Sequence, residues 1–386
     1  MLFKMKAGFW DNPIIAFVII FPFVKVHAFP YNNVQNVMIG GLFIFFLFLY
    51  VMFFKQFSHI AVWSLFFSIV IIASTLVNNR QYLFYSFFYS LRIMTFFLIF
   101  DIYLSQKKYV ILSVLENYLG ILFAINLFFQ IWQQDYWGYT VSNNYSNFFI
   151  DDNTLPFYVI ALISLLVIKS RIGYIKIWDI LKIIIAYLNL IKAWCASGLI
   201  AVTICLILIF FFSNNTFNLK ISLKYSAAFI GIIHLILIFG NSLIELLDDF
   251  MVRIFNKTIA YSRLLVWKTA IQNISKKPIL GYGTTEGGRQ SINYVGIRHW
   301  YAHNFVLEYL IQGGIIFLGI YIILIMLDIK KLDRCDYKTR GLFCCVFIGL
   351  HIAFLTEGTI TEPIEYLVYI LMFFAVELCQ QSSRIP

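Results

Sequence analysis

The side chains best suited to chemistry gather in one stretch of the chain. Three arginines lie there, Arg263, Arg289 and Arg298, and they are followed by His303 and Glu308. The planar fork of a guanidinium matches the oxygens of a phosphate group. Histidine and glutamate are common general acid–base residues. The pattern predicts a site that binds an anionic, phosphate-bearing ligand and moves a proton beside it.

The segment from Arg263 to Ser275 is predicted to be a helix that ends before Pro278. At about 100° per residue, one helix face holds Arg263 together with four apolar side chains: Trp267, Ala270, Ile271 and Ile274. An unpaired charge in apolar surroundings costs several kcal/mol, so Arg263 needs an anionic partner. We expect a ligand phosphate; the alternative is an arginine whose head reaches back to water.

Glycines punctuate the segment after this helix. Gly281 and Gly283 lie in Pro-Ile-Leu-Gly-Tyr-Gly, and Gly287 and Gly288 precede Arg289. Glycine permits positive φ, and successive N–H groups in such a turn can hold an anion. We therefore predict that Gly281 and Gly283 help to bind the anion; an ordinary tight turn is the alternative.

His303 and Asn304 stand where the chain enters the next apolar run. A helix over residues 302–327 would place His303 and Leu307 on one face, and Asn304 beside Glu308 at the i,i+4 spacing. We predict that His303 is catalytic and that Asn304 contacts the substrate. Glu308 is the second candidate for the acid–base residue.

Composition places these residues in a membrane protein. The chain is 61% hydrophobic and 12% charged, whereas soluble proteins carry about 25% charged residues. Runs of about 18 to 23 apolar residues recur, and each is long enough to cross the roughly 30 Å hydrocarbon core of a bilayer. A soluble enzyme, a disordered chain and a disulfide scaffold are excluded. The predicted fold class is an all-α integral membrane protein.

We predict about twelve transmembrane helices with both termini in the cytoplasm. They lie near residues 13–29, 36–54, 60–77, 82–104, 109–131, 154–170, 175–192, 196–212, 223–240, 302–327, 341–357 and 364–380. Alternate short loops are rich in Lys and Arg, which marks the cytoplasmic side. The first apolar run only faintly resembles a signal peptide, so we expect it to be retained.

The segment 241–301 is exterior by this count, although it is basic. Long loops translocate regardless of charge, and connections above about 15 residues are usually functional or disordered. Its aromatic, patterned sequence, which includes an amphipathic stretch from Leu243 to Phe250, argues against disorder. We therefore predict three parts: nine spans in 1–240, a large external helical loop in 241–301, and three spans in 302–386.

Other charged groups lie outside this loop. Arg92 lies about 15 Å inside a predicted span, where a charge is functional by default. We predict that it contacts the substrate; pairing with a tyrosine or carboxylate of a neighbouring span is the equal alternative. Glu357 and Glu362 are predicted to be solvated loop charges, with orientation of an acceptor as the alternative. His234 is predicted to be a core histidine.

Motifs for metal or nucleotide chemistry are missing from the sequence. It holds no DxD and no Walker A motif, and its six cysteines have no metal-ligand or CxxC spacing. We therefore expect no disulfide, no metal and no cofactor. The net charge of +10 reports orientation through short loops, so nucleic acid is not an expected partner.

The order of these residues resembles a superfamily of bacterial membrane proteins, the O-antigen polymerases and O-antigen ligases. The resemblance rests on Ser262-Arg263, Trp267, Pro278-x-x-Gly281-x-Gly283, and His303-Asn304 followed by Gly313-Gly314. Asp152-Asn153 and Ser197-Gly198 are similar to weaker features of the same family.

The resemblance implies a metal-independent glycosyltransferase with one large periplasmic loop in the bacterial inner membrane. Its expected donor is a glycan on undecaprenyl diphosphate, and its acceptor is the next lipid-linked repeat. Arg263, with Arg289 or Arg298, would neutralise the diphosphate, and His303 would position or deprotonate the acceptor hydroxyl. Membrane lipid and a regulator of chain length are the other expected partners.

Two alternatives stay open. A ligase would move the glycan to lipid A-core, but ligases continue their His motif with a spaced GxxG ending near Thr. This chain has Gly314-Ile315-Ile316-Phe317, which favours a polymerase. A polysaccharide flippase or transporter would hold its charges at the midplane and keep its external loops short. The charge here is concentrated in one long loop, which favours an enzyme.

Overall fold

The computed structural model describes residues 8–26, 32–53, 58–132, 148–213, 222–239, 249, 252–254, 260–285, 292–294, 297–299, 302–358 and 362–379. The first half contains α1 Pro13–Ile20, α2 Asn32–Phe53, α3 His59–Asn78, α4 Leu83–Ser105, α5 Val110–Trp132, α6 Leu155–Ile172 and α7 Ile177–Lys192. The second half contains α8 Ala196–Ser213, α9 Leu223–Phe239, α11 Ala260–Lys276, α12 Phe305–Leu332, α13 Tyr337–Phe354, α14 Leu367–Phe373 and α15 Ala375–Cys379. Short 3₁₀ turns are η1 Phe21–Phe23, η2 Arg80–Tyr82 and η4 Pro363–Tyr366.

The all-α membrane class is confirmed. Within the described ranges, eight helices are long and apolar enough to cross a membrane, and three shorter apolar helices are Pro13–Phe23, Leu223–Phe239 and Pro363–Phe373. Large apolar side chains such as Phe48, Phe66 and Phe84 point outward, as a lipid-facing surface requires. The count of twelve spans stays a prediction.

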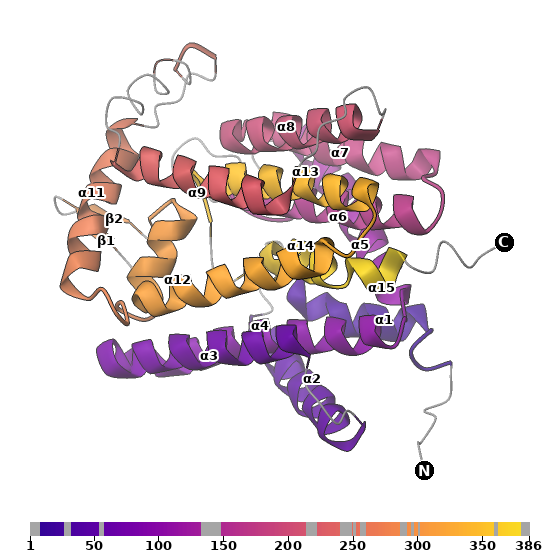
Figure 1. The fold of residues 1–386 in the computed structure, drawn as a ribbon, viewed down its shortest axis with the longest axis horizontal. Coiled ribbons are helices and arrows are strands. Elements are labelled where there is room, and N and C mark those ends of the chain that lie inside the picture. The colour runs from indigo at the N-terminus through magenta and orange to yellow at the C-terminus, as the bar shows by residue number, and fades with distance from the viewer. Residues whose placement is uncertain are drawn as a thin grey trace.

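The helices form one bundle, and α11 runs across its end (Figure 1). Helix α13 packs against α8, α3 packs against α4, and α12 lies between α3 and α14. The only strands in the described part of the chain are β1 Ile292–Tyr294 and β2 Ile297–His299, which pair antiparallel near α11. The predicted division at 240/241 and 301/302 stays a prediction, and α11 packs on α12 across the second boundary.

Helix α12 is broken at Gly314, where φ is 63° and ψ is −161°. A continuous helix over 302–327 was expected, so this break corrects the sequence prediction. The segment Pro278–Gly283 supplies the hydrogen bonds that the break removes: Tyr282 and Gly283 N–H donate to the carbonyls of Ile311 and Gln312 at 2.7 and 2.8 Å. Such partners are required, because lipid cannot satisfy a broken helix.

Helix α3 holds the other side of this inserted segment. The Ser74 hydroxyl contacts the carbonyls of Leu280 and Gln312. Asn78 Nδ2 donates to the Gly281 carbonyl at 3.0 Å, and Asn79 Nδ2 donates to Tyr282 at 2.6 Å. The segment is therefore clamped between α3 and α12, and it ties the end of α11 to the membrane helices.

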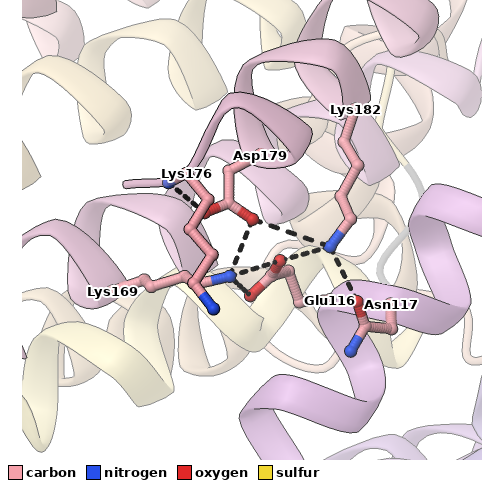
Figure 2. A network of polar contacts seen from close by, with 6 residues as sticks. All are labelled: Glu116, Asn117, Lys169, Lys176, Asp179 and Lys182. Carbon is pink, nitrogen blue, oxygen red and sulfur yellow. Dashed lines mark hydrogen bonds and ion pairs between the residues drawn. The ribbon is translucent and has the colours of Figure 1, made fainter. Parts of the chain in front are cut away.

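An ionic network joins α5, α6 and α7 at the C-terminal end of α6 (Figure 2). Lys169 Nζ lies 3.0 Å from Glu116 Oε1 and 2.7 Å from Asp179 Oδ1, and Lys182 also reaches both carboxylates. Two cations meet two buried carboxylates, so the charges compensate one another, as buried charge requires. This network is a structural tie between three helices.

The break predicts unequal responses to alanine at two glycines of α12. A Cβ at Gly314 would lie 2.2 Å from the Ile279 carbonyl oxygen, whereas a Cβ at Gly319 would meet nothing within 4 Å. The backbone conformation alone costs a non-glycine residue about 1–3 kcal/mol. Gly314→Ala should therefore lower the unfolding temperature of the purified protein in detergent, and Gly319→Ala should preserve or raise it. Equal unfolding temperatures of the two variants would show that the break does not require glycine at position 314.

Candidate active site

The Glu357 carboxylate lies between Arg263 and His303. Arg263 Nη2 donates to Glu357 Oε1 at 2.6 Å, and Nη1 contacts the Thr356 carbonyl. On the other side, His303 Nδ1 lies 3.1 Å from Glu357 Oε2. We call Arg263, Glu357 and His303 the Glu357 triad. It joins α11, the residues before α12, and the loop after α13.

Burial is unequal within the triad. The Glu357 side chain is 3% exposed, whereas the side chains of Arg263 and His303 are 19% and 23% exposed. A buried carboxylate is tolerated only when it is paired and hydrogen-bonded. Glu357 is therefore the most buried member of the triad, and a ligand would reach Arg263 and His303 first.

The contact with Glu357 selects the tautomer of the neutral His303 ring. An ionised carboxylate only accepts hydrogen bonds, so the ring must carry its proton on Nδ1. The basic lone pair of the neutral ring is then on Nε2, on the opposite side. This is the arrangement in which a carboxylate orients a histidine that serves as a general base.

The backbone at His303 is strained. Its φ is 52°, a left-handed value that is uncommon for residues other than glycine. The preceding residue, Ala302, is fixed from both sides: its N–H donates to Glu308 Oε2, and its carbonyl accepts from Trp267 Nε1, both at 2.9 Å. An uncommon backbone conformation that is maintained by the surrounding contacts is typical of functional sites.

Asn304 and Glu308 support the backbone in this structure. Asn304 is the N-cap of α12: its Oδ1 accepts from Leu307 N–H at 3.2 Å, and its Nδ2 donates to the Leu355 carbonyl at 3.0 Å. The helix therefore begins at Phe305, and His303 precedes it, which corrects the predicted placement of His303 on a helix face. Both Asn304 and Glu308 are fully buried, so their predicted contact with substrate or proton would require them to exchange partners.

The predicted helix at 263–275 is confirmed as α11. Its face with Val266, Trp267 and Ala270 is buried against the end of α9 and the start of α12, while Lys268 and Gln272 are exposed. Arg263 therefore enters the site from a helix that is anchored by its apolar face. The anionic partner expected for Arg263 is, in this structure, Glu357.

The two glycines predicted to bind the anion have a different role here. Gly281 and Gly283 have positive φ as expected, 61° and 76°. Their N–H groups, however, donate to the carbonyls of Lys277 and Gln312. An added Cβ would collide with Ile311 at Gly281 and with Thr75 at Gly283. Close packing explains these glycines, because neither N–H is available to an anion in this conformation.

Of the other predicted site arginines, Arg298 and Arg92 lie on described elements. Arg298 lies in β2, opposite Asn293 of β1. Arg289 and the amphipathic stretch from Leu243 lie outside the described residues. Arg92 lies on α4, with Nε and Nη2 buried and without a hydrogen-bond partner among the described residues.

Glu357 is the residue that the sequence interpretation missed. Both Glu357 and Glu362 were expected to be solvated, but they are 2% and 5% exposed. The available signal was charge complementarity: two carboxylates lie in a loop without basic residues, at the same end as a basic loop.

Cys195 lies in the short turn between α7 and α8. Burial raises the pKa of its thiol to about 11, and the carboxylates of Glu357 and Asp152 contribute to the rise. The group therefore stays a thiol at neutral pH, and it does not supply a thiolate nucleophile.

The long apolar helices define a multi-pass membrane protein, and the Glu357 triad is a polar site at the end of its helix bundle. Residues 156–322 match the Wzy_C family model, which is described as O-antigen ligase. The resemblance to the O-antigen polymerase and ligase superfamily is thereby confirmed over this segment, which includes Arg263 and His303 but ends before Glu357. No match was found among curated proteins.

Proposed function

We propose that this protein is a polymerase of lipid-linked O-antigen or a related surface polysaccharide. It transfers the growing glycan from undecaprenyl diphosphate to the next lipid-linked repeat. The Glu357 triad carries the proposal, because it combines an oriented base with a cation at one partly exposed position. The segment matched by the O-antigen ligase family supports the same reaction class.

The proposed step uses the tautomer that Glu357 selects. The acceptor hydroxyl oxygen attacks the anomeric carbon of the donor sugar, and the bond from that carbon to the diphosphate oxygen breaks. The hydroxyl proton moves to His303 Nε2, and undecaprenyl diphosphate leaves with the bonding electron pair. Glu357 stabilises the imidazolium that forms, as the carboxylate of a catalytic triad does.

Arg263 is proposed to face the diphosphate as negative charge develops on it. A fixed guanidinium in a water-poor site stabilises such charge more strongly than it would in water. Arg289 and Arg298, on the same loop, are proposed to complete the anion site. The leaving group is stabilised by protein cations in this scheme, so it needs no divalent metal.

The proposed setting is the outer face of the bacterial inner membrane, with both termini in the cytoplasm. The charge of the short loops supports this orientation. The apolar helices suit a polyprenyl tail, and a regulator of chain length is the proposed protein partner. The sequence Gly314-Ile315-Ile316-Phe317 favours polymerase over ligase. The partly exposed Glu357 triad, with Arg263 contributed by the long loop, favours an enzyme over a flippase.

Reconstitution tests the proposed reaction. The purified full chain in liposomes, given only lipid-linked repeat units, should lengthen them without nucleotide sugar, and EDTA should leave the rate unchanged. Products resolved by gel electrophoresis would show a ladder of repeats. A product formed only when lipid A-core is added would identify a ligase, and movement of lipid across vesicles without lengthening would identify a transporter.

Two variants test the division of roles within the triad. Arg263→Lys keeps the charge but loses the fork, so polymerisation should fall severely while the protein still inserts. His303→Ala should reduce the transfer rate by roughly 10² to 10⁴ and leave binding of the lipid-diphosphate donor nearly intact. Arg263→Ala should weaken that binding. Donor affinity and chain length should be compared at matched membrane levels; wild-type chains from both His303→Ala and Arg263→Lys would remove the triad from catalysis.

A further inference from the structure

A second polar cluster lies at the same end of the bundle as the Glu357 triad. We call it the Arg92 cluster, and it consists of Lys25, Arg92, Tyr158, Glu362 and Glu365. Lys25 Nζ lies 3.9 Å from Glu362 Oε1, and its backbone N–H donates to the Tyr158 hydroxyl at 3.4 Å. Both α4, which carries Arg92, and α6, which carries Tyr158, pack against η4, and Arg92, Glu362 and Glu365 act electrostatically on the Tyr158 hydroxyl. The segment after η1 and the elements α4, α6 and η4 therefore converge on one place.

Arg92 is the member that the protein leaves unsatisfied. Its Nε and Nη2 atoms are buried and have no hydrogen-bond partner among the described residues, and it forms no ion pair with them. A buried donor without a partner costs about 1–3 kcal/mol, and a charged group inside a membrane bundle is functional by default. These two guanidinium donors are therefore not used by the described residues.

The charge balance indicates the class of that ligand. Two cations, Lys25 and Arg92, stand with two carboxylates, Glu362 and Glu365, which are 5% and 1% exposed. The described members of the cluster thus hold equal numbers of cations and carboxylates; such a set attracts a dianion weakly, but it offers both donors and acceptors. Sugar hydroxyls both donate and accept hydrogen bonds, so a glycan fits this cluster better than a diphosphate does.

Chain geometry places the cluster next to the proposed reaction centre. Glu357 and Glu362 belong to the same loop between α13 and η4. Five residues of extended chain span at most about 18 Å, which limits the separation of the Glu357 and Glu362 Cα atoms. One end of this loop orients His303, and the other end contributes to the Arg92 cluster.

We propose that the Arg92 cluster binds the sugar residues of the acceptor repeat and presents their hydroxyl to His303. This inference rests on the proposed function and adds the acceptor subsite to it. Arg92 Nε and Nη2 donate to acceptor hydroxyls, and the carboxylates of Glu362 and Glu365 accept from them. Arg92 is thus a specificity-determining residue, and the diphosphate is left to Arg263.

Direct binding measurements on the full-length protein test this inference without requiring transfer. The probes are undecaprenyl diphosphate and the oligosaccharide repeat, released by mild acid from lipid-linked repeats of a polymerase-deficient strain. Arg92→Gln should raise the dissociation constant of the oligosaccharide about 10- to 100-fold, as expected for a lost charged hydrogen bond. It should leave the affinity for undecaprenyl diphosphate within about twofold.

Arg80→Gln is the matched control, because Arg80 is an exposed arginine in η2, which directly precedes the N-terminus of α4. It should change neither dissociation constant. Lys25→Gln, at the 35% exposed edge of the cluster, provides a second variant if Arg92→Gln fails to fold, and it should weaken oligosaccharide binding about 3- to 10-fold.

Unchanged oligosaccharide binding in folded Arg92→Gln, or in folded Lys25→Gln if that variant replaces it, would assign the cluster a structural role. Equal weakening of both probes in Arg92→Gln would assign it to the diphosphate. Either result overturns the inference. A wild-type protein that lengthens no lipid-linked repeat would instead refute the proposed function, and the binding comparison would still decide what the Arg92 cluster recognises.

Discussion

The Glu357 carboxylate is a buried charge at the end of a membrane bundle, and such a charge must be compensated by groups brought to it. Arg263 and His303 provide this compensation from parts of the chain 94 and 54 residues away in sequence. The pairing links α11, the residues before α12 and the loop after α13. It also sets the tautomer of His303, so one ionic contact both assembles the site and prepares its base.

The rest of the fold makes that contact possible. Trp267 and Glu308 fix Ala302, and this holds His303 in a left-handed backbone conformation. The break at Gly314 separates the first part of α12 from the rest of the helix, and the segment Pro278–Gly283 fills the break. The polar groups of an irregular backbone are thereby satisfied by protein where lipid could not satisfy them.

Local patterns allowed much of this to be predicted from sequence. Apolar runs located the helices, the periodicity of residues 263–275 placed Arg263 on the packed face of α11, and residue chemistry selected His303. The pairing of Glu357 with both residues was not predictable, because periodicity reports one helix at a time. Gly281 and Gly283 were correctly expected to have positive φ. Their N–H groups, however, donate to the carbonyls of Lys277 and Gln312, and the break in α12 beside Gln312 was not predictable from any local pattern.

A double-mutant cycle on the transfer rate tests most directly whether Glu357 acts through His303. Single-turnover rates would be measured for the wild type, Glu357→Gln, His303→Ala and the combined variant, all reconstituted at equal protein levels. Residues that act as one unit are strongly non-additive. If Glu357 serves to orient His303, the combined variant should transfer about as fast as His303→Ala alone. Multiplication of the two single losses would show that Glu357 and His303 act independently, and would contradict the account.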